Sequence, residues 1–394
     1  MFADVTNPQL WEFGMIARNL VAGKGYSLSY TESGAVPNAE MVGVITVSSA
    51  YMPPGYVWFV AIFLTLVGDQ PLSYSLMLII QSIAGAIATV VLYWVSKKRF
   101  PSHVAKFAGY LCAIYPPFVY TVTDFGSTTF YILLLGCTLL AIMSVQKKHS
   151  ILQSLITGLS AALLTLFRAD GLIIAIGLCV LLIIRGYLSY AAVFLIMLIV
   201  GLLPWIGRNY IVFKKVVPLT TSFGFNFWRG HNPIASGTGR ELSGEGIWRS
   251  EQVDQKLRQL SLSTQYEIKR DKVFFEEAVS FIKSHPAKEI MLSMQKLFYL
   301  WILDITHPKA RSLPYVFSWG IMLMLFFLGL YASVKMNYGI DVFVTYYVVM
   351  SFIVIIFFVL PRYQIILAYG ITPISAVGLW RLMEYLLQRK RPSL

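Results

Sequence analysis

Residues 73–95 read SYSLMLIIQSIAGAIATVVLYWV and hold no charged side chain. A helix needs about 20 predominantly apolar residues to cross the hydrocarbon core of a bilayer, so this stretch predicts a membrane-spanning helix. Lys97, Lys98 and Arg99 follow it, and basic residues gather on the cytoplasmic side of membrane proteins. The stretch therefore predicts a span and the side of the membrane on which it ends.

The composition of the whole chain agrees with a membrane protein. Of the 394 residues, 57% are hydrophobic and 13% are charged, whereas soluble domains carry about 25% charged residues. This composition excludes a water-soluble enzyme, a disordered regulator and a secreted disulfide scaffold. The net charge is +13, but the basic residues bracket apolar runs, so we attribute them to membrane topology and expect no nucleic-acid partner. Three cysteines in apolar runs, without metal or redox spacing, are interpreted as core residues: Cys112, Cys137 and Cys179.

Eight further apolar runs are long enough, or nearly so, to span a membrane. They lie at 104–121, 126–146, 150–167, 170–184, 188–206, 313–334, 342–360 and 363–380. A shorter run, Tyr56 to Gly68, has only about a dozen apolar residues, too few for a span. If it does not span, the basic residues fall on alternate connections, as the positive-inside rule requires. We therefore predict nine spans, a cytoplasmic C-terminus and a juxtamembrane or re-entrant helix at 56–68.

These spans predict an all-α polytopic membrane protein with five parts. Residues 1–72 form an exterior segment, 73–206 a bundle of six spans, 207–312 a small exterior domain, 313–380 three more spans and 381–394 a basic tail. The exterior segment contains an amphipathic helix that ends near Gly23, and the exterior domain has a Gly-rich loop followed by helices near 250–260, 264–283 and 286–301. Since an exported N-terminus normally has a signal or a first span, we expect an upstream helix to be missing.

Ionisable residues at the ends of spans are expensive and often functional. The predicted topology places six ionisable residues at the exterior face: Glu12, Asp124, Arg168, Asp170, Arg208 and Arg362. Carboxylates suit general-base chemistry on a hydroxyl or amine, and arginines suit a phosphate. The combination fits transfer from a lipid-linked phosphate donor, whose leaving group is an anion that arginines can stabilise.

Each candidate also has a structural interpretation, and the sequence leaves both open. Arg168 and Asp170 either pair across a tight turn or bind ligand. Arg208 could be an interfacial anchor beside Trp205, and Arg362 could extend to the membrane surface. Asp124 could cap the following helix. Glu12 could be a solvated charge, and Asp4 is a weaker catalytic candidate than Glu12. His231 has no second ligand at metal-binding spacing.

Six segments resemble, in order, motifs of the GT-C superfamily of integral membrane glycosyltransferases. The resemblance is to the group that holds protein O-mannosyltransferases and the aminoarabinose transferases of lipid A, a glycosyltransferase family 39-like group. Residues 12–26 are similar to an acidic-aromatic pair followed by "IAxNLxxGxGY", and YMPPGY at 51–56 to "YPPGYP". FRADGL at 167–172, PWIGRNY at 204–210, FWRGHNP at 227–233 and PRY at 361–363 resemble "xRPEGL", "PWxxRNY", "LWxGNNP" and "xRYxxPxxP".

The resemblance implies a polyprenyl-phosphate sugar donor at the exterior face, a carboxylate base and inversion at the anomeric carbon. It assigns Glu12 and Asp124 to acidic catalytic positions, with Asp4 as a substitute. It assigns Arg168, Arg208 and Arg362 to the donor phosphate, Tyr51, Tyr56 and Tyr363 to the lipid-phosphate pocket, and His231 and Asn232 to substrate binding. The chain departs from the family where Gln9, Met52 and Thr128 replace an expected Asp, Lys and Glu, so a catalytically inactive lipid-binding relative stays an alternative.

A transporter or lipid flippase is the alternative from another class. Transporters have broken spans and often repeated halves; Tyr115-Pro116-Pro117 within a span fits this, but no halves repeat. The sequence does not identify the sugar or the acceptor, which could be a lipid, a glycan or a protein, and it leaves open whether a divalent metal is a cofactor. Exterior Asn-X-Ser/Thr sites are absent, which favours a prokaryotic plasma membrane. The expected partners are the lipid-linked donor and membrane lipids.

Overall fold

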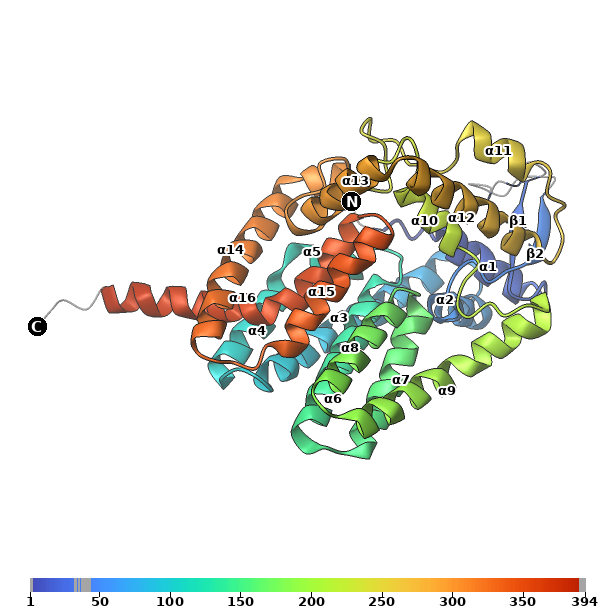
Figure 1. Ribbon diagram of the computed structural model, residues 1–394. Helices are drawn as coiled ribbons and strands as arrows, with labels where there is room; N and C mark the ends of the chain where they lie inside the picture. Colours follow the sequence, from blue (N-terminus) through green and yellow to red (C-terminus); the bar gives the residue numbers. More distant parts are fainter. Residues whose placement is uncertain (1–2, 32–33, 35, 37–43, 390–394) are drawn as a thin grey trace, which may run out of the picture.

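The computed structural model describes residues 3–31, 34, 36 and 44–389. Five of its helices are long and apolar enough to cross a membrane: α3 (Pro71–Lys97), α6 (Thr128–Lys148), α9 (Leu188–Phe213), α14 (Leu313–Lys335) and α16 (Pro361–Arg389). Shorter apolar helices pack among them in Figure 1: α7 (Ile151–Phe167), α8 (Gly171–Ile184) and α15 (Asp341–Ile356). The predicted helical membrane fold is confirmed, whereas the number of spans stays a prediction.

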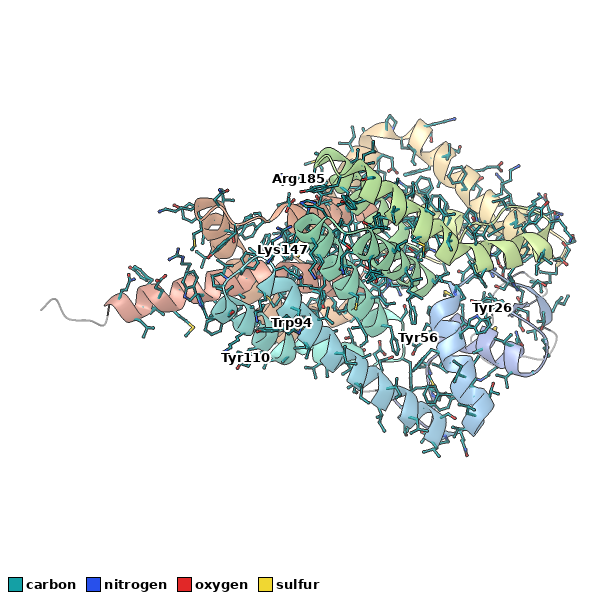
Figure 2. The ribbon with its side chains drawn as sticks, turned by 90° about the horizontal axis from the view of Figure 1, so that it is seen from below. Tyr26, Tyr56, Trp94, Tyr110, Lys147 and Arg185 are labelled. Carbon is teal, nitrogen blue, oxygen red and sulfur yellow. The ribbon has the colours of Figure 1, made fainter. Side chains whose placement is uncertain are left out.

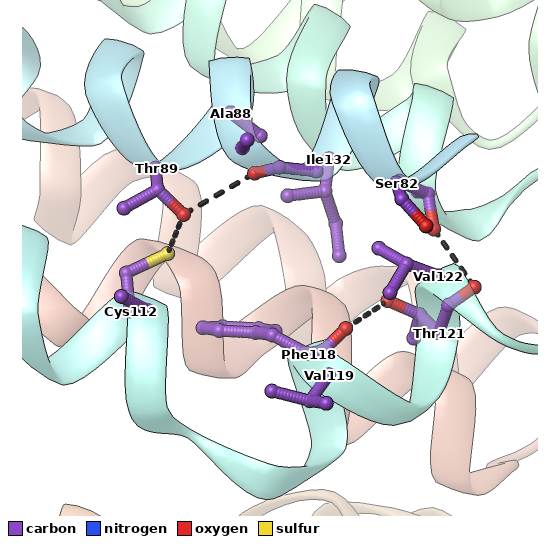
Figure 3. A pocket seen from close by; sticks show the side chains of 13 residues that line it. Ser82, Ala88, Thr89, Cys112, Phe118, Val119, Thr121, Val122 and Ile132 are labelled. Carbon is purple, nitrogen blue, oxygen red and sulfur yellow. Dashed lines mark hydrogen bonds between the residues drawn. The ribbon is translucent and has the colours of Figure 1, made fainter. Parts of the chain in front are cut away.

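The run predicted as one span at 104–121 is broken into α4 (Ser102–Ile114) and α5 (Pro116–Val122). Tyr115 between them is extended, with ψ 114°, because a residue before proline is driven out of the helical region. The break leaves a cavity of about 310 Å³ between α3, α4, α5 and α6, lined largely by small or apolar residues such as Gly85, Ala88 and Ile132 (Figure 3). The span predicted at 342–360 also ends early, because Phe357 leaves the helical conformation.

Helices α14 and α16 approach each other to backbone contact. A Cβ on Gly329 would lie 1.8 Å from the carbonyl oxygen of Ile374, and one on Gly378 would lie 2.0 Å from that of Leu325. Small residues allow this approach, which is the means by which helices associate where no water drives them together. The pair therefore forms the closest-packed part of the C-terminal bundle described here.

The opposite end of the molecule carries the shorter elements. Figure 1 shows them gathered away from the C-terminus: α1 (Trp11–Val21), β1 (Ser27–Tyr30), β2 (Ile45–Ser48), α2 (Pro54–Val67), α10 (Phe223–Gly230), α11 (Glu251–Leu257), α12 (Tyr266–Ser284), α13 (Pro286–Trp301) and the 3₁₀ turn η1 (Pro308–Arg311). The sequence analysis did not predict the antiparallel β1–β2 pair, in which Ser27 lies opposite Ser48. All four residues of β1 are buried.

The carboxylate of Glu267 on α12 connects several segments at this end through hydrogen bonds. It is buried and accepts hydrogen bonds from the Tyr30 hydroxyl at 3.0 Å, from the amide of Ala50 at 3.0 Å and from the Thr221 hydroxyl. Burial raises the pKa of Glu267, and these hydrogen bonds oppose that rise by stabilising its charged form. Glu267 thereby joins the strand pair, the loop that follows it and the entrance to α10.

The basic connections of the bundle meet on one face. Asp341 at the start of α15 accepts from Arg185 at 3.0 Å, lies 3.5 Å from Arg99 and accepts from Gln146 at 3.1 Å. Figure 2 shows Lys147 and Arg185 at the same end as Trp94, with Tyr26 and Tyr56 at the other end. This grouping agrees with the predicted alternation of connections, and the assignment of the face to the cytoplasm stays a prediction.

Replacing Gly329 by Ala should destabilise the protein by about 1–3 kcal/mol, because the added methyl group overlaps the backbone of α16. The thermal midpoint in detergent should fall accordingly. Gly320→Ala on the same helix is the matched control, since its Cβ would meet nothing within 4 Å and alanine has the higher helix propensity. Equal midpoints for the two variants would contradict this account of the α14–α16 contact.

Candidate functional site

The candidate catalytic carboxylate Glu12 lies in the first turn of α1. The residue before it, Trp11, has a φ of 51°, a left-handed conformation that costs a bulky side chain energy. Glu12 interacts electrostatically with Tyr51, Arg229 and Arg362. Three residues from segments far apart in the sequence therefore lie within electrostatic range of Glu12.

Arg362 stands on the first turn of α16, directly after the Pro361 that opens the helix. Its side chain is accessible to solvent, yet protein surrounds it closely enough to weaken its hydration. Its charged neighbours include Arg168, Asp170 and Glu12, and Tyr363 is adjacent. An accessible cation among protein groups is suited to receive an anion from outside.

Arg168 is paired within the protein. Its Nε and Nη2 donate to the two oxygens of Asp170 at 3.1 and 2.8 Å, and its guanidinium lies 5.1 Å from the ring centres of both Tyr131 and Tyr363. The short turn between α7 and α8 places both partners of this bidentate pair. The pairing that the sequence left open is thus present, and Asp170 compensates the charge of Arg168.

Two buried arginines that the sequence analysis did not single out flank the same region. Arg229 on α10 lies 4.5 Å from the ring centres of Trp248 and Phe358, and its Nη2 donates to the carbonyl of Gly239 at 2.7 Å. Burial, together with the nearby Arg362, lowers the pKa of Arg229 to about 10, so it stays protonated at neutral pH. Arg270 on α12 lies 5.5 Å from the centre of the Tyr51 ring.

Both arginines have unused hydrogen-bonding capacity. Among the described residues, Nε of Arg229 and Nε and Nη1 of Arg270 are buried without a hydrogen-bond partner. A buried donor that is left without a hydrogen-bond partner costs the protein free energy, so these N–H groups are available to an anion. The segment FWRGHNP, which carries Arg229, was noticed in the sequence, whereas Arg270 lies on an amphipathic helix where a solvated charge is expected.

Three further predicted site residues lie near the Glu12 side of the site: Asp124, Tyr56 and Asp4. Asp124 is exposed between α5 and α6 and interacts electrostatically with Tyr56. The ring of Tyr56 packs edge-on against that of Phe13, with 5.2 Å between the ring centres, and Phe13 follows Glu12 in the sequence. The amide of Ala3 donates to the carbonyl of Thr123 at 2.9 Å, which brings the segment of Asp4 here. Hydrogen bonds from Thr6 lower the pKa of Asp4, which makes this carboxylate a weaker base.

The other predicted ligands have their polar atoms engaged by the protein. Nη1 of Arg208 donates to the carbonyl of Ser49 at 2.6 Å and Nη2 to that of Tyr26 at 2.8 Å. His231 contacts Glu289 at 2.6 Å and the carbonyl of Ile356 at 2.8 Å. The amide of Asn232 bonds within its own turn, to Trp228 and to Ile234. These contacts engage all three residues within the protein, and their roles in substrate binding stay predictions.

The cluster of Glu12, Tyr51, Arg229, Arg362 and Tyr363 thus combines one carboxylate with cations and phenol rings. A carboxylate can take a proton from a hydroxyl or amine, and guanidinium groups can hold a phosphate. Within residues 3–31, 34, 36 and 44–389 there is no group of three His, Cys, Asp or Glu side chains that could hold a metal ion.

Comparison with known sequences relates the N-terminal part of the bundle to one family. The sequence model described as dolichyl-phosphate-mannose-protein mannosyltransferase matches residues 51–206, which is less than half of the chain. This match includes Tyr51, Tyr56, Asp124 and Arg168. A comparison with curated proteins finds no match.

Among solved structures, the oligosaccharyltransferase of Archaeoglobus fulgidus tethered to an acceptor peptide is similar over 96% of this chain, with a TM-score of 0.53 and 14% identity. The same archaeal protein in complex with an inhibitory peptide and a dolichol-phosphate gives a TM-score of 0.51 and 12% identity over 97% of this chain. The chain spans only 46% and 48% of these two structures. ArnT of Cupriavidus metallidurans bound to undecaprenyl phosphate matches 99% of this chain and 77% of its own, with a TM-score of 0.43 and 12% identity. The predicted resemblance to GT-C glycosyltransferases is confirmed as a likeness of fold.

Replacing Asp170 by Asn should cost about 3–5 kcal/mol of stability, because Arg168 would keep its buried charge without its counter-ion. The control is Glu276→Gln on α12, whose ion pair with Lys272 is 3.6 Å long and exposed and is worth no more than about 1 kcal/mol. Thermal unfolding of the two variants measures the difference, and a small loss for Asp170→Asn would show that the Arg168–Asp170 pair is dispensable.

Proposed function

We propose that this chain, which has the fold of GT-C glycosyltransferases, transfers a sugar from a polyprenyl-phosphate donor to an acceptor at the exterior face of the membrane. The observation that carries the proposal is that Arg229 and Arg362 lie within electrostatic range of Glu12. The complex of the archaeal oligosaccharyltransferase with a dolichol-phosphate supports this class of donor.

In this mechanism Glu12 accepts the proton of the acceptor hydroxyl or amine as that group attacks the anomeric carbon. The bond from the anomeric carbon to the phosphate oxygen breaks, and the polyprenyl phosphate leaves with the electron pair. Attack opposite the leaving group inverts the anomeric configuration. Arg362 and Arg229 hold the phosphate as its negative charge develops, which lowers the barrier because the cations are in place beforehand.

The remaining site residues have supporting roles in the proposal. Tyr51 and Tyr363 border the phosphate on two sides, and Arg270 contributes its charge from behind Tyr51. Arg168 stabilises Tyr363 by lying against its ring. Asp124 and Tyr56 form the side on which the acceptor enters, and Asp124 is the second carboxylate available to it. We place the enzyme in a prokaryotic plasma membrane, with the site outside.

The donor class can be tested by native mass spectrometry of the protein extracted gently from its own membranes. We expect a co-purified polyprenyl phosphate or its glycosylated form, whose mass names the sugar class. Arg362→Gln should lose most of this lipid, because the phosphate would lose an accessible cation. A folded protein that carries only bulk phospholipid would count against a glycosyltransferase.

Glu12→Gln should lower kcat by about 10²–10⁴-fold, because the amide cannot accept the proton of the acceptor. Donor binding should persist, since the arginines are unchanged. Turnover of a donor identified by mass spectrometry measures the first effect and retention of that lipid the second. Glu276→Gln, remote from the cluster and exposed, should keep normal turnover. A transporter would be insensitive to Glu12→Gln, and an inactive relative would show no turnover in the parent protein.

A further inference from the structure

The segment between α15 and α16, residues 357–360, is hydrogen-bonded to the loop that follows α10. The amide of Val359 donates to the carbonyl of Gly237 at 3.1 Å, and the amide of Gly239 donates to the carbonyl of Val359 at 3.3 Å. The ring of Phe358 lies 4.5 Å from the guanidinium of Arg229. Arg362 follows directly, so the path of this connecting segment sets where Arg362 stands.

A chain of three buried side chains holds the beginning of the connecting segment. Glu289 and Lys296 come from α13, and His231 follows α10. Nδ1 of His231 is 2.6 Å from a carboxylate oxygen of Glu289, and Nε2 is 2.8 Å from the carbonyl oxygen of Ile356. Nζ of Lys296 is 3.2 Å from the same Nε2 and donates to the carbonyl of Ile355 at 3.0 Å. These carbonyls belong to the last turn of α15, where the helix leaves them without partners.

The proposed mechanism does not use these three side chains, and they cost the protein free energy to bury. Lys296 is fully buried, His231 is 5% exposed and Glu289 is 8% exposed. There is no room between the end of α10 and the connecting segment, because a Cβ on Gly230 would lie 1.7 Å from the carbonyl oxygen of Phe357. Any expansion of the buried chain would therefore move residues 357–360.

Both ring nitrogens of His231 are already engaged, Nδ1 by the carboxylate of Glu289 and Nε2 by the carbonyl of Ile356. Nζ of Lys296 lies 3.2 Å from the same Nε2, inside a buried and closely packed region. A protonated Lys296 would therefore hold an ammonium group against the ring without water to solvate it, which favours movement of the side chains apart.

We propose that Glu289, His231 and Lys296 form a proton-dependent clamp that holds the connecting segment and thereby positions Arg362. The clamp is closed while Lys296 is uncharged and loosens when Lys296 is protonated. His231, Glu289 and Lys296 are thus positioning residues. The role of Arg362 in donor binding rests on the proposed function, whereas the clamp is a property of the fold.

The electrostatic surroundings of Lys296 support this proton dependence. Burial lowers the pKa of Lys296 to about 7, and the partial compensation comes from Glu289. Among the described residues that contact Lys296, His231 is the other titratable group, and α15 presents backbone carbonyls. The folded state therefore holds the proton of Lys296 less tightly than the unfolded chain does. Below about pH 7 the protonated Lys296 lowers the free energy of unfolding. This loss decreases as the pH rises from 7 towards 10.5.

The test compares the parent protein with Lys296→Met, which keeps the length of the side chain and removes its charge. The thermal midpoint of the parent should rise between pH 6 and pH 8.5, whereas that of Lys296→Met should stay nearly level and be the higher of the two at pH 6. Lys283→Met on the exposed surface of α12 is the matched control and should keep the parental slope. The same slope in Lys296→Met and the parent would overturn the proton dependence. This measurement needs no turnover, so it stands even if the proposed function fails.

A second measurement follows the connecting segment itself. A spin label on a cysteine introduced at Leu360 should become more mobile as the parent protein is brought from pH 8.5 to pH 6, and Lys296→Met should abolish the change. If Lys296→Met does not fold, Glu289→Gln provides the same test, because loss of the counter-ion should loosen the segment at both pH values. Label mobility that is independent of pH in the parent would overturn the clamp.

The effect of the clamp on catalysis can be measured from the pH dependence of KM for the donor. With a donor identified by mass spectrometry, the parent KM for that donor should increase about tenfold from pH 8 to pH 6, while Lys296→Met should show a flat KM profile. A purely structural Lys296 would lower the amount of folded enzyme without altering the pH profile of KM, and that result would overturn the positioning role.

Discussion

The end of this protein that carries the shorter elements depends on one buried carboxylate, that of Glu267. It accepts hydrogen bonds from Tyr30, Ala50 and Thr221, which belong to three segments that share no secondary structure. A buried anion is tolerated only where its oxygens are fully hydrogen-bonded, so these segments must come together for α12 to pack. Tyr51 follows Ala50 directly, and Arg208 holds the carbonyl of Ser49 from the other side. The loop that carries Tyr51 is thus held by hydrogen bonds on both sides, and these bonds fix the position of Tyr51 relative to Glu12.

The parts of the fold that the sequence could predict are those governed by solvation. Long apolar runs predicted the helical bundle, because backbone polar groups and charges are not stable in hydrocarbon. The same constraint brought Glu12, Arg168, Asp170 and Arg362 to one end. The β1–β2 pair was missed because four-residue strands give almost no periodic signal. The break at Tyr115 was visible as a proline pair, but whether a span bends or divides there depends on its neighbours.

Contacts made by individual side chains were beyond the sequence. Arg208, His231 and Asn232 lie within motifs that suggested ligand binding, and their polar atoms are taken up by backbone groups and by Glu289. Arg229 and Arg270 were overlooked for the opposite reason, because arginines in a polar loop or on an amphipathic helix are expected to face water. Only tertiary packing shows that both are buried against aromatic rings. The unpaired N–H groups of these two arginines, among the described residues, indicate an anion more directly than the arginines that sequence motifs suggest.

Helix α16 runs without interruption from Pro361 to Arg389. At 1.5 Å per residue it is about 43 Å long, more than the roughly 30 Å thickness of the hydrocarbon core. Arg362 stands on its first turn, and the last turns extend well beyond the bundle towards the C-terminus (Figure 1). Pro373 is the position inside this helix where bending is easiest, and below it Gly378 is locked against α14. The contact with α14 at Gly378 therefore divides the helix into a C-terminal part that extends beyond the bundle and an N-terminal part that carries Arg362, with Pro373 between the contact and Arg362.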